Sequence, residues 1–510
     1  MKEYIVSLNK DVNYDEFWEQ METSILSHDH VPTRPIEIVN NRDLSLRSCH
    51  YSLTDNEAQL LRNDPRVASV LLPAPAALRA TTALQTGDFS REAISFPEII
   101  DPNLVNWGLR RMVVEDLEAQ VGTEYPYCLD GTGVDVVIQD DGVFGEHPEF
   151  QDSRGNSRFV ELDWYAAAGV PGTMPEGHYG NVGAHGTHVA GIATGKTYGW
   201  AKGATVYSIR YDLFENISDV FDLIKTWHLK KPIDPKTGYR RPTIVNQSWG
   251  YRWFYDNAII GGSLTDLVYR GVSRGATINP TFGNVNASHG FHYTASDVDQ
   301  QELTDAGVIC VKAAGNYYHK VDAPGGIDYN NYYTFDTTWG FVIDPSTPIY
   351  YHRGSSPWSP DTITVASIDS QPAGSKEQVA EYSERGPGID YFAPGSDVTS
   401  ATNSEGFYGF TTFYPPSDGY RIARISGTSM STPQITGMLA LFLQVNPGAT
   451  IDQCREWLDT NSSKLNKIFT TGLTNDYSNT RSIMGQENKF PFFPNARDIG
   501  FKQSGGVIKK

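Results

Sequence analysis

The central part of the chain alternates short apolar runs with helical patterns, and this alternation constrains the fold more than any other feature of the sequence. The apolar runs cover residues 134–138, 205–209, 243–246, 308–313 and 362–366. Runs that are apolar on both faces are typical of parallel strands, which are buried because crossover helices cover both sides of the sheet. The sequence therefore predicts an α/β fold with a mostly parallel central sheet.

Composition limits the class of protein and of partner. A chain of 510 residues with 39% hydrophobic residues can bury a large core, and its length predicts two or more domains. The 41 basic and 60 acidic side chains give a formal net charge of −19. Such an acidic balance disfavours phosphate binding, so nucleic acid is not expected as a partner. No stretch approaches the roughly 18 consecutive apolar residues of a spanning helix, so no membrane partner is expected either.

Cysteine usage gives no sign of a metal site. Cys49, Cys128, Cys310 and Cys454 are far apart and match no zinc spacing such as C-x-x-C. Buried free thiols are the favoured interpretation, and a disulfide is left open.

Residues 1–80 predict a small domain of their own. The first residues alternate like an edge strand and lead into a helical pattern around Phe17. Thr54 and Glu57 form a capping-box pattern at the start of a second helix, and residues 67–72 supply a closing strand. The predicted order β-α-β-β-α-β is that of a ferredoxin-like α+β domain.

The composition changes after this domain. Residues 81–105 are rich in Ala, Thr, Pro, Ser and Gly, which predicts a linker with a possible processing site because such segments are accessible to proteases. We expect the main domain over residues 106–465, with insertions near 251–297 and 317–358, and a C-terminal extension over 466–510. The insertions are rich in Tyr, Asn, Gly and His, and the pattern does not decide between binding loops, oligomer contacts and loop packing.

An acidic residue follows the first buried run of the main domain. Asp140 lies just past the carboxyl end of the strand at 134–138, where an open α/β sheet has its ligand crevice. Asp141 is adjacent, but the D-x-G spacing to Gly142 favours Asp140. By itself the pattern also fits an Asx-type turn at a strand end.

A histidine and a serine complete the candidate chemistry. His185 begins a run of small residues that would let a helix approach the sheet closely, whereas His188 is more often a structural histidine. Ser429 begins a helix that ends near residues 446–447, and a helix N-terminus offers free N–H groups to a developing oxyanion. A helix cap is the alternative role for this serine. The order acid, base, nucleophile predicts a serine hydrolase, because a histidine oriented by a carboxylate can activate a hydroxyl group.

Three motifs together resemble those of subtilisin-type serine proteases, with some similarity to the proteinase K branch. They are residues 140–143 with 147–150, residues 185–191 and residues 427–433. The resemblance covers roughly residues 107–447 and implies a subtilisin-like three-layer fold. It implies a serine endopeptidase that hydrolyses peptide bonds through an acyl-enzyme, with a catalytic triad of Asp140, His185 and Ser429.

The same resemblance implies roles for further residues. Asn316, in the stretch 313–316, matches an asparagine that donates into the oxyanion hole, and removing such a donor costs about 10²- to 10³-fold in rate. Two segments would bind an extended polypeptide substrate through their backbone. The residues implied in substrate binding are Ser248, Trp249, Gly250, Ala313, Ala314 and Gly315.

The N-terminal unit is similar to the inhibitory propeptide domain of secreted subtilases. This similarity implies an autoinhibited zymogen whose own N-terminal domain is an intramolecular inhibitor, cut between about residues 73 and 95. The first residues lack the apolar run of a signal peptide, so no export signal is expected. Chains with such a start and with Tyr- and Asn-rich inserts also resemble those encoded by tailed phages, which predicts a cytoplasmic or virion-associated location.

Two other functions stay open at this stage. One is an inhibited or structural subtilase-like component of a larger protein assembly, such as a phage particle. The other is acyl transfer to an amine, as in a macrocyclase, for which the insertions would supply a lid that excludes water.

The sequence also departs from the family pattern. Gln139 replaces the apolar residue usual before the acid, and Gln434 stands where histidine is common. Residues 194–202 lack the Asn-rich loop that holds calcium in many subtilisins, while Asp369 matches a proteinase K-like calcium ligand. We therefore expect chemistry that requires no cofactor, and structural calcium stays open. The insertions prevent the family's substrate preference from being transferred.

Overall fold

The computed structural model describes most of the chain, and the structural statements below concern the residues that it describes. These are residues 1–23, 29–42, 44–73, 79–81, 84–85, 106–113, 127, 129–180, 182–254, 264–277, 279–283, 288–335, 348–373, 376–403, 411–413, 419–462, 481–487 and 489–493.

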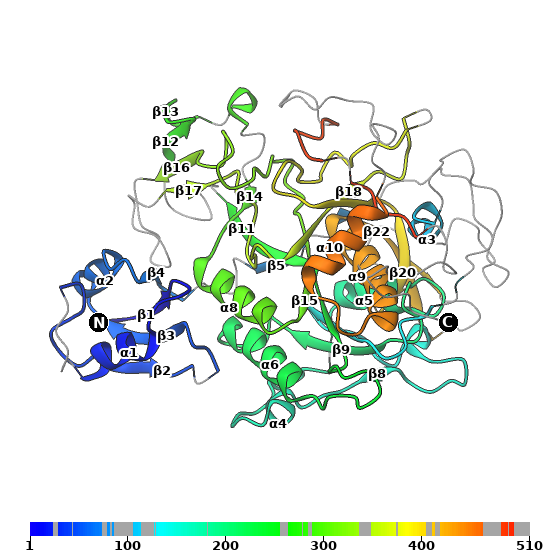
Figure 1. The fold of residues 1–510 in the computed structure, drawn as a ribbon. Coiled ribbons are helices and arrows are strands. Elements are labelled where there is room, and N and C mark those ends of the chain that lie inside the picture. The colour runs from blue at the N-terminus through cyan, green and yellow to red at the C-terminus, as the bar shows by residue number, and fades with distance from the viewer. Residues whose placement is uncertain are drawn as a thin grey trace, which may run out of the picture.

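A seven-stranded parallel sheet forms the centre of the main domain (Figure 1), in the order β19-β18-β15-β10-β7-β9-β8. Its strands are β7 (Asp135–Asp140), β8 (Phe159–Val160), β9 (Thr205–Arg210), β10 (Thr243–Gln247), β15 (Ile309–Ala313), β18 (Ile363–Ile368) and β19 (Tyr391–Pro394). On β7, Val136 and Ile138 belong to one hydrophobic core and Val137 to the other. The strand is apolar on both faces because both are covered, and the predicted α/β fold is confirmed.

Two layers of helices cover the sheet. The layer on the larger core contains α3 (Trp107–Arg111), α5 (Ala184–Thr194), α9 (Thr428–Val445) and α10 (Ile451–Thr460). The opposite layer contains α4 (Trp164–Ala168), α6 (Ile217–Lys230) and α8 (Thr294–Asp305). The small residues of α5 allow a close approach, as predicted: a Cβ on Gly191 would lie 2.1 Å from Oγ of Ser400.

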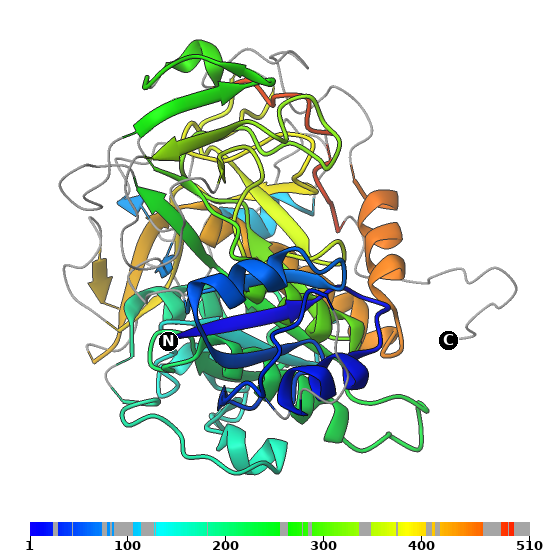
Figure 2. The same cartoon turned by 90° about the vertical axis from the view of Figure 1, so that its left-hand side faces the viewer.

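The N-terminal domain is a separate sheet with its own core (Figures 1 and 2). Its elements are β1 (Lys2–Leu8), α1 (Tyr14–Thr23), β2 (Ile38–Asn40), β3 (Ser48–Leu53), α2 (Asp55–Arg62) and β4 (Val67–Leu71). The strands pair antiparallel in the order β2-β3-β1-β4. Thr54 and Glu57 form the predicted capping box. The sheet packs on α8 of the main domain, and the predicted small α+β domain is confirmed.

The insertions build a second, smaller sheet. Its strands follow the order β13-β12-β16-β17 and enclose a core that includes Leu267, Tyr333 and Tyr351. The elements of this region are β11 (Trp249–Phe254), β12 (Leu264–Tyr269), β13 (Val272–Ser273), a 3-10 turn at Pro280–Phe282, β14 (Ser288–Gly290), β16 (Tyr332–Phe335) and β17 (Ile349–Tyr350). Part of the aromatic content of the insertions therefore serves packing.

The remaining strands lie close to the start of α9. They are β20 (Val398–Thr402), β21 (Thr411–Phe413) and β22 (Arg421–Ser426), and β22 leads directly into that helix. A 3-10 turn spans Pro148–Phe150. From the predicted C-terminal extension, Phe490, Phe492 and Phe493 pack into the main core. The described part of the extension is therefore an integral part of this core.

Two further sequence predictions concern the membrane and the cysteines. Among the described residues, no helix has both the length and the apolar composition needed to cross a bilayer. Cys49, Cys310 and Cys454 are buried free thiols, as favoured from the sequence, and Cys128 lies outside the described residues.

Candidate active site

The carboxyl end of β7 and the start of α5 bring an acid and a base into contact. Nδ1 of His185 lies 2.7 Å from Oδ1 of Asp140, and both side chains are almost completely buried. Asp140 is the last residue of β7, and His185 is the second residue of α5. The other ring nitrogen, Nε2 of His185, has no hydrogen-bond partner in the described part of the chain. This nitrogen can therefore accept a proton from a further group.

The electrostatics of the pair favour a charged histidine. Burial acts to lower the pKa of His185, but the carboxylates of Asp140 and Asp141 outweigh it, so the pKa is raised above its usual range. A base whose protonated form is stabilised in this way is suited to take a proton from a neighbouring hydroxyl group.

Asp141 differs in role from its neighbour. Its Oδ1 accepts a hydrogen bond of 2.7 Å from the backbone N–H of Gly186, in the first turn of α5. A Cβ on Gly183, the N-cap residue, would lie 1.9 Å from Oδ2 of Asp141, so the close approach requires glycine there. Burial and the charge of Asp140 raise the pKa of Asp141 to about 7. The two adjacent carboxylates thus have different roles: Asp140 contacts the imidazole of His185, and Asp141 caps helix α5.

Ser429 lies in the first turn of α9, which packs against α5. Figure 1 shows these two helices side by side. Oγ of Ser429 donates to the backbone oxygen of Ser248 at 2.9 Å, and Oγ of Ser248 donates to the backbone oxygen of Ser429 at 3.0 Å. The hydroxyl group of Ser429 is therefore directed to the candidate substrate strand, and Nε2 of His185 does not receive it in this state.

The amide of Asn316 is oriented by the residue before the serine. Oδ1 of Asn316 accepts hydrogen bonds from the backbone N–H of Thr428 at 3.0 Å and from its Oγ1 at 2.9 Å. Oγ1 of Thr428 also accepts from the backbone N–H of Gly315 at 3.1 Å. Nδ2 of Asn316 is buried and has no hydrogen-bond partner among the described residues. The amide therefore offers free donors beside the N-terminus of α9.

Thr428 was not singled out from the sequence. The sequence signal that could have identified Thr428 is its position directly before Ser429, because a residue next to the nucleophile lies close to the groups that contact the nucleophile. Only the contact with Asn316, which is distant in sequence, reveals its orienting role.

The candidate substrate strand is already paired with another strand of the same chain. The short strand β5 (Arg79–Thr81) pairs antiparallel with β11, with Thr81 opposite Trp249 and Ala80 opposite Gly250. The Trp249 side chain is buried and stacks on the ring of Tyr211, with centroids 4.4 Å apart. Trp249 therefore offers its backbone, and not its indole ring, to a paired chain.

A second short strand pairs with the segment that leads into the helix of Ser429. β6 (Leu84–Gln85) pairs antiparallel with β22, with Leu84 opposite Ser426. Ser426 directly precedes Gly427, the N-cap residue of α9. The two short strands therefore pair with segments that adjoin Ser429, β11 through Ser248 and β22 through Gly427.

The other predicted wall of the cleft lies at the end of β15. Ala313 ends this strand, and the backbone N–H of Ala314 donates to the oxygen of Val365 at 3.0 Å. Gly315 follows and is tied to Thr428. The stretch from Ala313 to Gly315 thus leads from the central sheet to the amide of Asn316.

Three further polar residues noted in the sequence have structural contacts. Nε2 of His188 lies 2.9 Å from the backbone oxygen of Ala423, and burial lowers the pKa of His188 to about 3. Oε1 of Gln139 accepts from Gln247 at 2.8 Å. Oε1 of Gln434 accepts from the indole N–H of Trp200 at 2.7 Å. His188 is therefore a neutral, structural histidine, as expected.

Asp369 and the group of Asp140, Asp141 and His185 are the side chains to consider as metal ligands, and each has partners within the chain. Asp369 forms an ion pair with Arg481, so a cation of the chain already neutralises it. Within the described residues, the one group of potential ligands whose atoms converge is Asp140, Asp141 and His185. That group is the candidate active site, where Nδ1 of the imidazole is engaged with Asp140.

Comparison with protein families matches residues 131–482 of the chain to the Subtilase family. An extracellular serine proteinase of Thermus sp. (strain Rt41A) is 27% identical over 409 residues, which cover 80% of this chain and 69% of that protein. A cuticle-degrading serine protease of Arthrobotrys oligospora is 27% identical over 342 residues, which cover 67% of this chain and 59% of that protein. The chain thus spans between 59% and 69% of the length of these relatives.

Among solved structures, fervidolysin from Fervidobacterium pennivorans, a keratinolytic enzyme related to subtilisin, is similar in fold. The TM-score is 0.50 at 17% sequence identity, and the match covers 97% of this chain and 60% of that one. The family match extends over well more than half of the chain and includes Asp140, His185, Asn316 and Ser429. The chain therefore belongs to the subtilase family of serine proteases.

Proposed function

We propose that the chain is a serine endopeptidase that hydrolyses peptide bonds through an acyl-enzyme. The observation that carries this proposal is the buried 2.7 Å contact between Asp140 and His185, on a helix that packs against the helix of Ser429. Oγ of Ser429 attacks the scissile carbonyl carbon, Nε2 of His185 takes the hydroxyl proton, and Asp140 stabilises the imidazolium. His185 then protonates the leaving amine, and a water molecule activated in the same way releases the acid and restores the serine.

The oxyanion would be bound by two donors at the start of α9. One is Nδ2 of Asn316, which is buried, oriented by Thr428 and without a partner among the described residues. The other is the backbone N–H of Ser429 in the first turn of the helix, where intrahelical acceptors are lacking. Donors that are placed before the reaction stabilise the developing charge without a cost of reorganisation.

The side chain of Ser429 has a resting orientation in this structure. Its Oγ donates to Ser248, so the productive geometry requires rotation about χ1 towards Nε2 of His185. Catalytic hydrogen bonds are often completed only when substrate is bound. A substrate strand that pairs with β11 would also contact the backbone around Ser248, which favours this rotation.

We further propose that the N-terminal domain is an intramolecular inhibitor that the enzyme cuts from itself. The edges of β11 and β22 beside Ser429 are occupied by β5 and β6. Thr81 pairs next to Ser248, which contacts Ser429, and Leu84 pairs with Ser426, three residues before Ser429, so we expect self-cleavage at a bond between Thr81 and Leu84. Thr82 and Ala83, which lie between them in sequence, are outside the described residues, as is most of the predicted linker 81–105.

A buried ion-pair cluster holds this domain on α6 and α8. Arg42 of the N-terminal domain lies 2.8 Å from Oδ2 of Asp222 and 2.7 Å from Oδ1 of Asp299, with all three side chains buried. Lys225 of α6 donates to the backbone oxygen of Leu44 at 2.6 Å. Contacts of this kind do not depend on the segment that would be cut. They favour the alternative that the domain stays bound after cleavage and keeps the enzyme inhibited.

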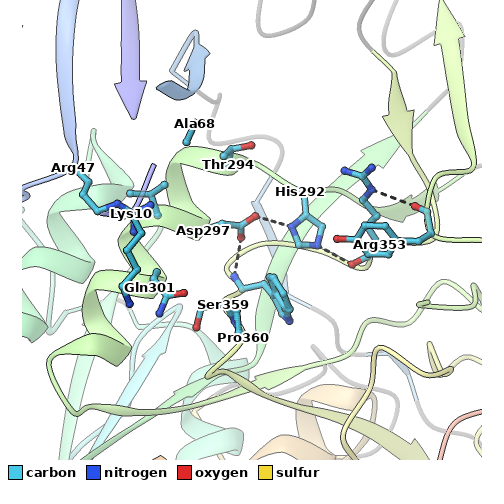
Figure 3. A pocket seen from close by; sticks show the side chains of 13 residues that line it. Lys10, Arg47, Ala68, His292, Thr294, Asp297, Gln301, Arg353, Ser359 and Pro360 are labelled. Atoms are coloured by element: carbon cyan, nitrogen blue, oxygen red, sulfur yellow. Dashed lines mark hydrogen bonds and ion pairs between the residues drawn. The ribbon is translucent and has the colours of Figure 1, made fainter. Parts of the chain in front are cut away.

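The contact between the two domains is open at one edge. A cavity of about 320 Å³ is lined by Lys10, Arg47 and Ala68 of the N-terminal domain and by residues of α8 and the insertion (Figure 3). Figure 3 shows His292 between Asp297 and Arg353, with Nδ1 2.6 Å from the carboxylate and Nε2 2.8 Å from the backbone oxygen of Arg353. Apart from the cavity, Ile5 of the N-terminal domain packs into the hydrophobic core that contains α6 and α8, so docking combines ion pairs with apolar contacts.

Labelling and mass measurements test the proposal. We expect a serine-directed phosphonate to label Ser429, and we expect the intact mass of the protein to show two fragments that meet between Thr81 and Leu84. Ser429→Ala is expected to stay uncut and unlabelled. A Ser429 that stays unlabelled both with and without residues 1–80 would contradict the endopeptidase, and a cut elsewhere would contradict the placement of the bond. Size-exclusion chromatography of cut protein shows whether the domain is released or retained.

A further inference from the structure

A buried carboxyl group lies directly behind the candidate oxyanion hole. Glu384 is 1% exposed, and a Cβ on Gly315, the residue before Asn316, would lie 2.5 Å from Oε2 of Glu384. The backbone N–H of Glu384 donates to the oxygen of Gly315 at 2.9 Å. Gly315 has a φ of +122°, which glycine adopts readily, so it supplies both the turn and the space for the carboxyl group. Glu384 is therefore held against the segment that carries Asn316.

The groups around Glu384 compensate its charge only in part. Lys312 on β15 faces the carboxyl group, but its Nζ is directed to the backbone oxygen of Ser355. Arg385, on the same segment, donates to the backbone oxygen of Glu381 at 3.2 Å. The phenol of Tyr317 faces the group from the turn after Asn316. Oε2 of Glu384 has no hydrogen-bond partner in the described part of the chain.

The surroundings favour the uncharged acid at neutral pH. Burial raises the pKa of Glu384 to about 8, although Lys312, a backbone hydrogen bond from Gly290 and Arg385 act to lower it. Burial also lowers the pKa of Lys312 to about 8. Below about pH 8 the carboxyl group is therefore mainly protonated. Loss of its proton to solvent places a negative charge behind the donors that would bind the oxyanion.

We propose that Glu384 is a positioning residue that works as an uncharged carboxylic acid. It holds the segment of Gly315 and Asn316 in place without opposing the negative charge that develops on the substrate oxygen. The inference rests on the proposed endopeptidase function and deepens it, because it names the group that sets the alkaline limit of the same site. Like charges repel strongly in a low-dielectric interior, so ionisation of Glu384 is expected to slow acylation about tenfold or more.

The test compares pH profiles of the processed protein on an internally quenched peptide. For wild type, we expect kcat/KM at about pH 9.5 to fall to about a tenth of its value at about pH 7, with a midpoint near pH 8. For Glu384→Gln, the ratio of the two values is expected to be close to unity. Glu381→Gln, which changes an exposed carboxylate on the same segment, is the matched control and should follow wild type. Lys312→Met removes the neighbouring amine, whose pKa is also about 8, and should keep the decline with its midpoint moved to higher pH, because Lys312 acts to lower the pKa of Glu384.

Each outcome decides for or against the role of Glu384. A decline that persists in Glu384→Gln, or one that disappears in Lys312→Met alone, overturns the proposal. If Glu384→Gln does not fold, the wild-type profile still decides, because a profile that stays flat through about pH 9.5 overturns it. Phosphonate labelling of Ser429 at neutral pH is measured on the same samples. Absent labelling of wild type contradicts the proposed function, whereas normal labelling with an unchanged profile contradicts only the role of Glu384.

Discussion

In the described part of the chain, the N-terminal domain contacts α6 and α8 and also the candidate active site, and these two contacts use different chemistry. On α6 and α8 the contact is made by side chains, with Arg42 between Asp222 and Asp299. At the candidate active site it is made by backbone pairing of β5 with β11. Ion pairs between buried side chains select one partner, whereas backbone pairing accepts many extended sequences. If the N-terminal domain acts as the proposed inhibitor, the difference indicates that it is recognised at one surface, while the other remains suited to varied polypeptides.

The largest expected effect comes from removing the nucleophile, which tests the active-site contact. Ser429→Ala is expected to lower kcat/KM by at least about 10⁴-fold and to leave the chain uncut, because the proton acceptor His185 then has no nucleophile to activate. A peptide assay and the intact mass check both expectations. Ser431→Ala, which changes a buried serine in the same helix, is the control and should be processed. Ser429→Ala protein that cuts itself between Thr81 and Leu84 would sink the self-processing hypothesis.

The second largest effect also concerns the candidate active site, where one hydrogen-bond donor to the oxyanion is removed. Asn316→Ala is expected to lower kcat about 10²- to 10³-fold with little change in KM, because the lost hydrogen bond would be made to the oxyanion and not to the bound substrate. Thr428→Val, which removes the hydroxyl group that orients Asn316, should give a smaller loss in kcat. Steady-state kinetics separate kcat from KM. A change confined to KM would assign Asn316 to substrate binding instead.

A smaller effect tests the side-chain contact. Arg42→Met leaves Asp299 buried without its cation, whereas Asp222 keeps its ion pair with Lys225, and docking is expected to weaken by about 3 kcal/mol, or about 100-fold. Lys10→Met is the matched control at the same surface, because Lys10 and Asp305 are 54% and 39% exposed and such pairs contribute less than about 1 kcal/mol. Retention of the cut domain in size-exclusion chromatography measures both. Equal losses would contradict a dominant role for Arg42.

The smallest expected effect is a pH dependence of this docking. Burial raises the pKa of Asp299 to about 6, although Arg42 acts to lower it. Because the docked pKa exceeds the usual carboxyl value, the contribution to docking is complete below that value and is lost as the pH rises through about 6. The cut domain should therefore dissociate about threefold to tenfold faster at about pH 7.5 than at about pH 5. Asp299→Asn should remove the difference, and tighter docking at the higher pH would refute this sign.

Local patterns in the sequence predicted the elements well where one stretch of chain decides the structure. The capping box of Thr54 and Glu57 forms as predicted, because both residues belong to one helix turn. Asp140 ends a central strand and contacts His185, because a parallel sheet places all carboxyl ends at one edge. The apolar run of Val136 to Ile138 predicted burial on both faces, and the two cores on either side of β7 confirm it.

Residues that act through distant contacts were not predicted. Arg42 and Glu384 carry no local signal, since an arginine or glutamate is usually exposed and only burial between separate elements makes either one informative. The C-terminal phenylalanines fall in residues 466–510, which were expected to be an extension of the main domain. They belong to the main core because α3, α9 and α10 leave an apolar surface for them. The complementarity of two surfaces cannot be predicted from a single stretch of sequence, because the surfaces come from separate segments.

The sequence by itself determined the α/β class, the small N-terminal domain and the order of acid, base and nucleophile, because these depend on periodicity, helix caps and the geometry common to parallel sheets. Only the tertiary structure decided that Asp141 caps the helix of His185 and that two short strands pair with the segments next to Ser429. It also placed a buried acid behind Asn316. The reason is physical: hydrogen-bond partners and the burial that shifts a pKa come from residues that are far apart in the chain and meet only when it folds.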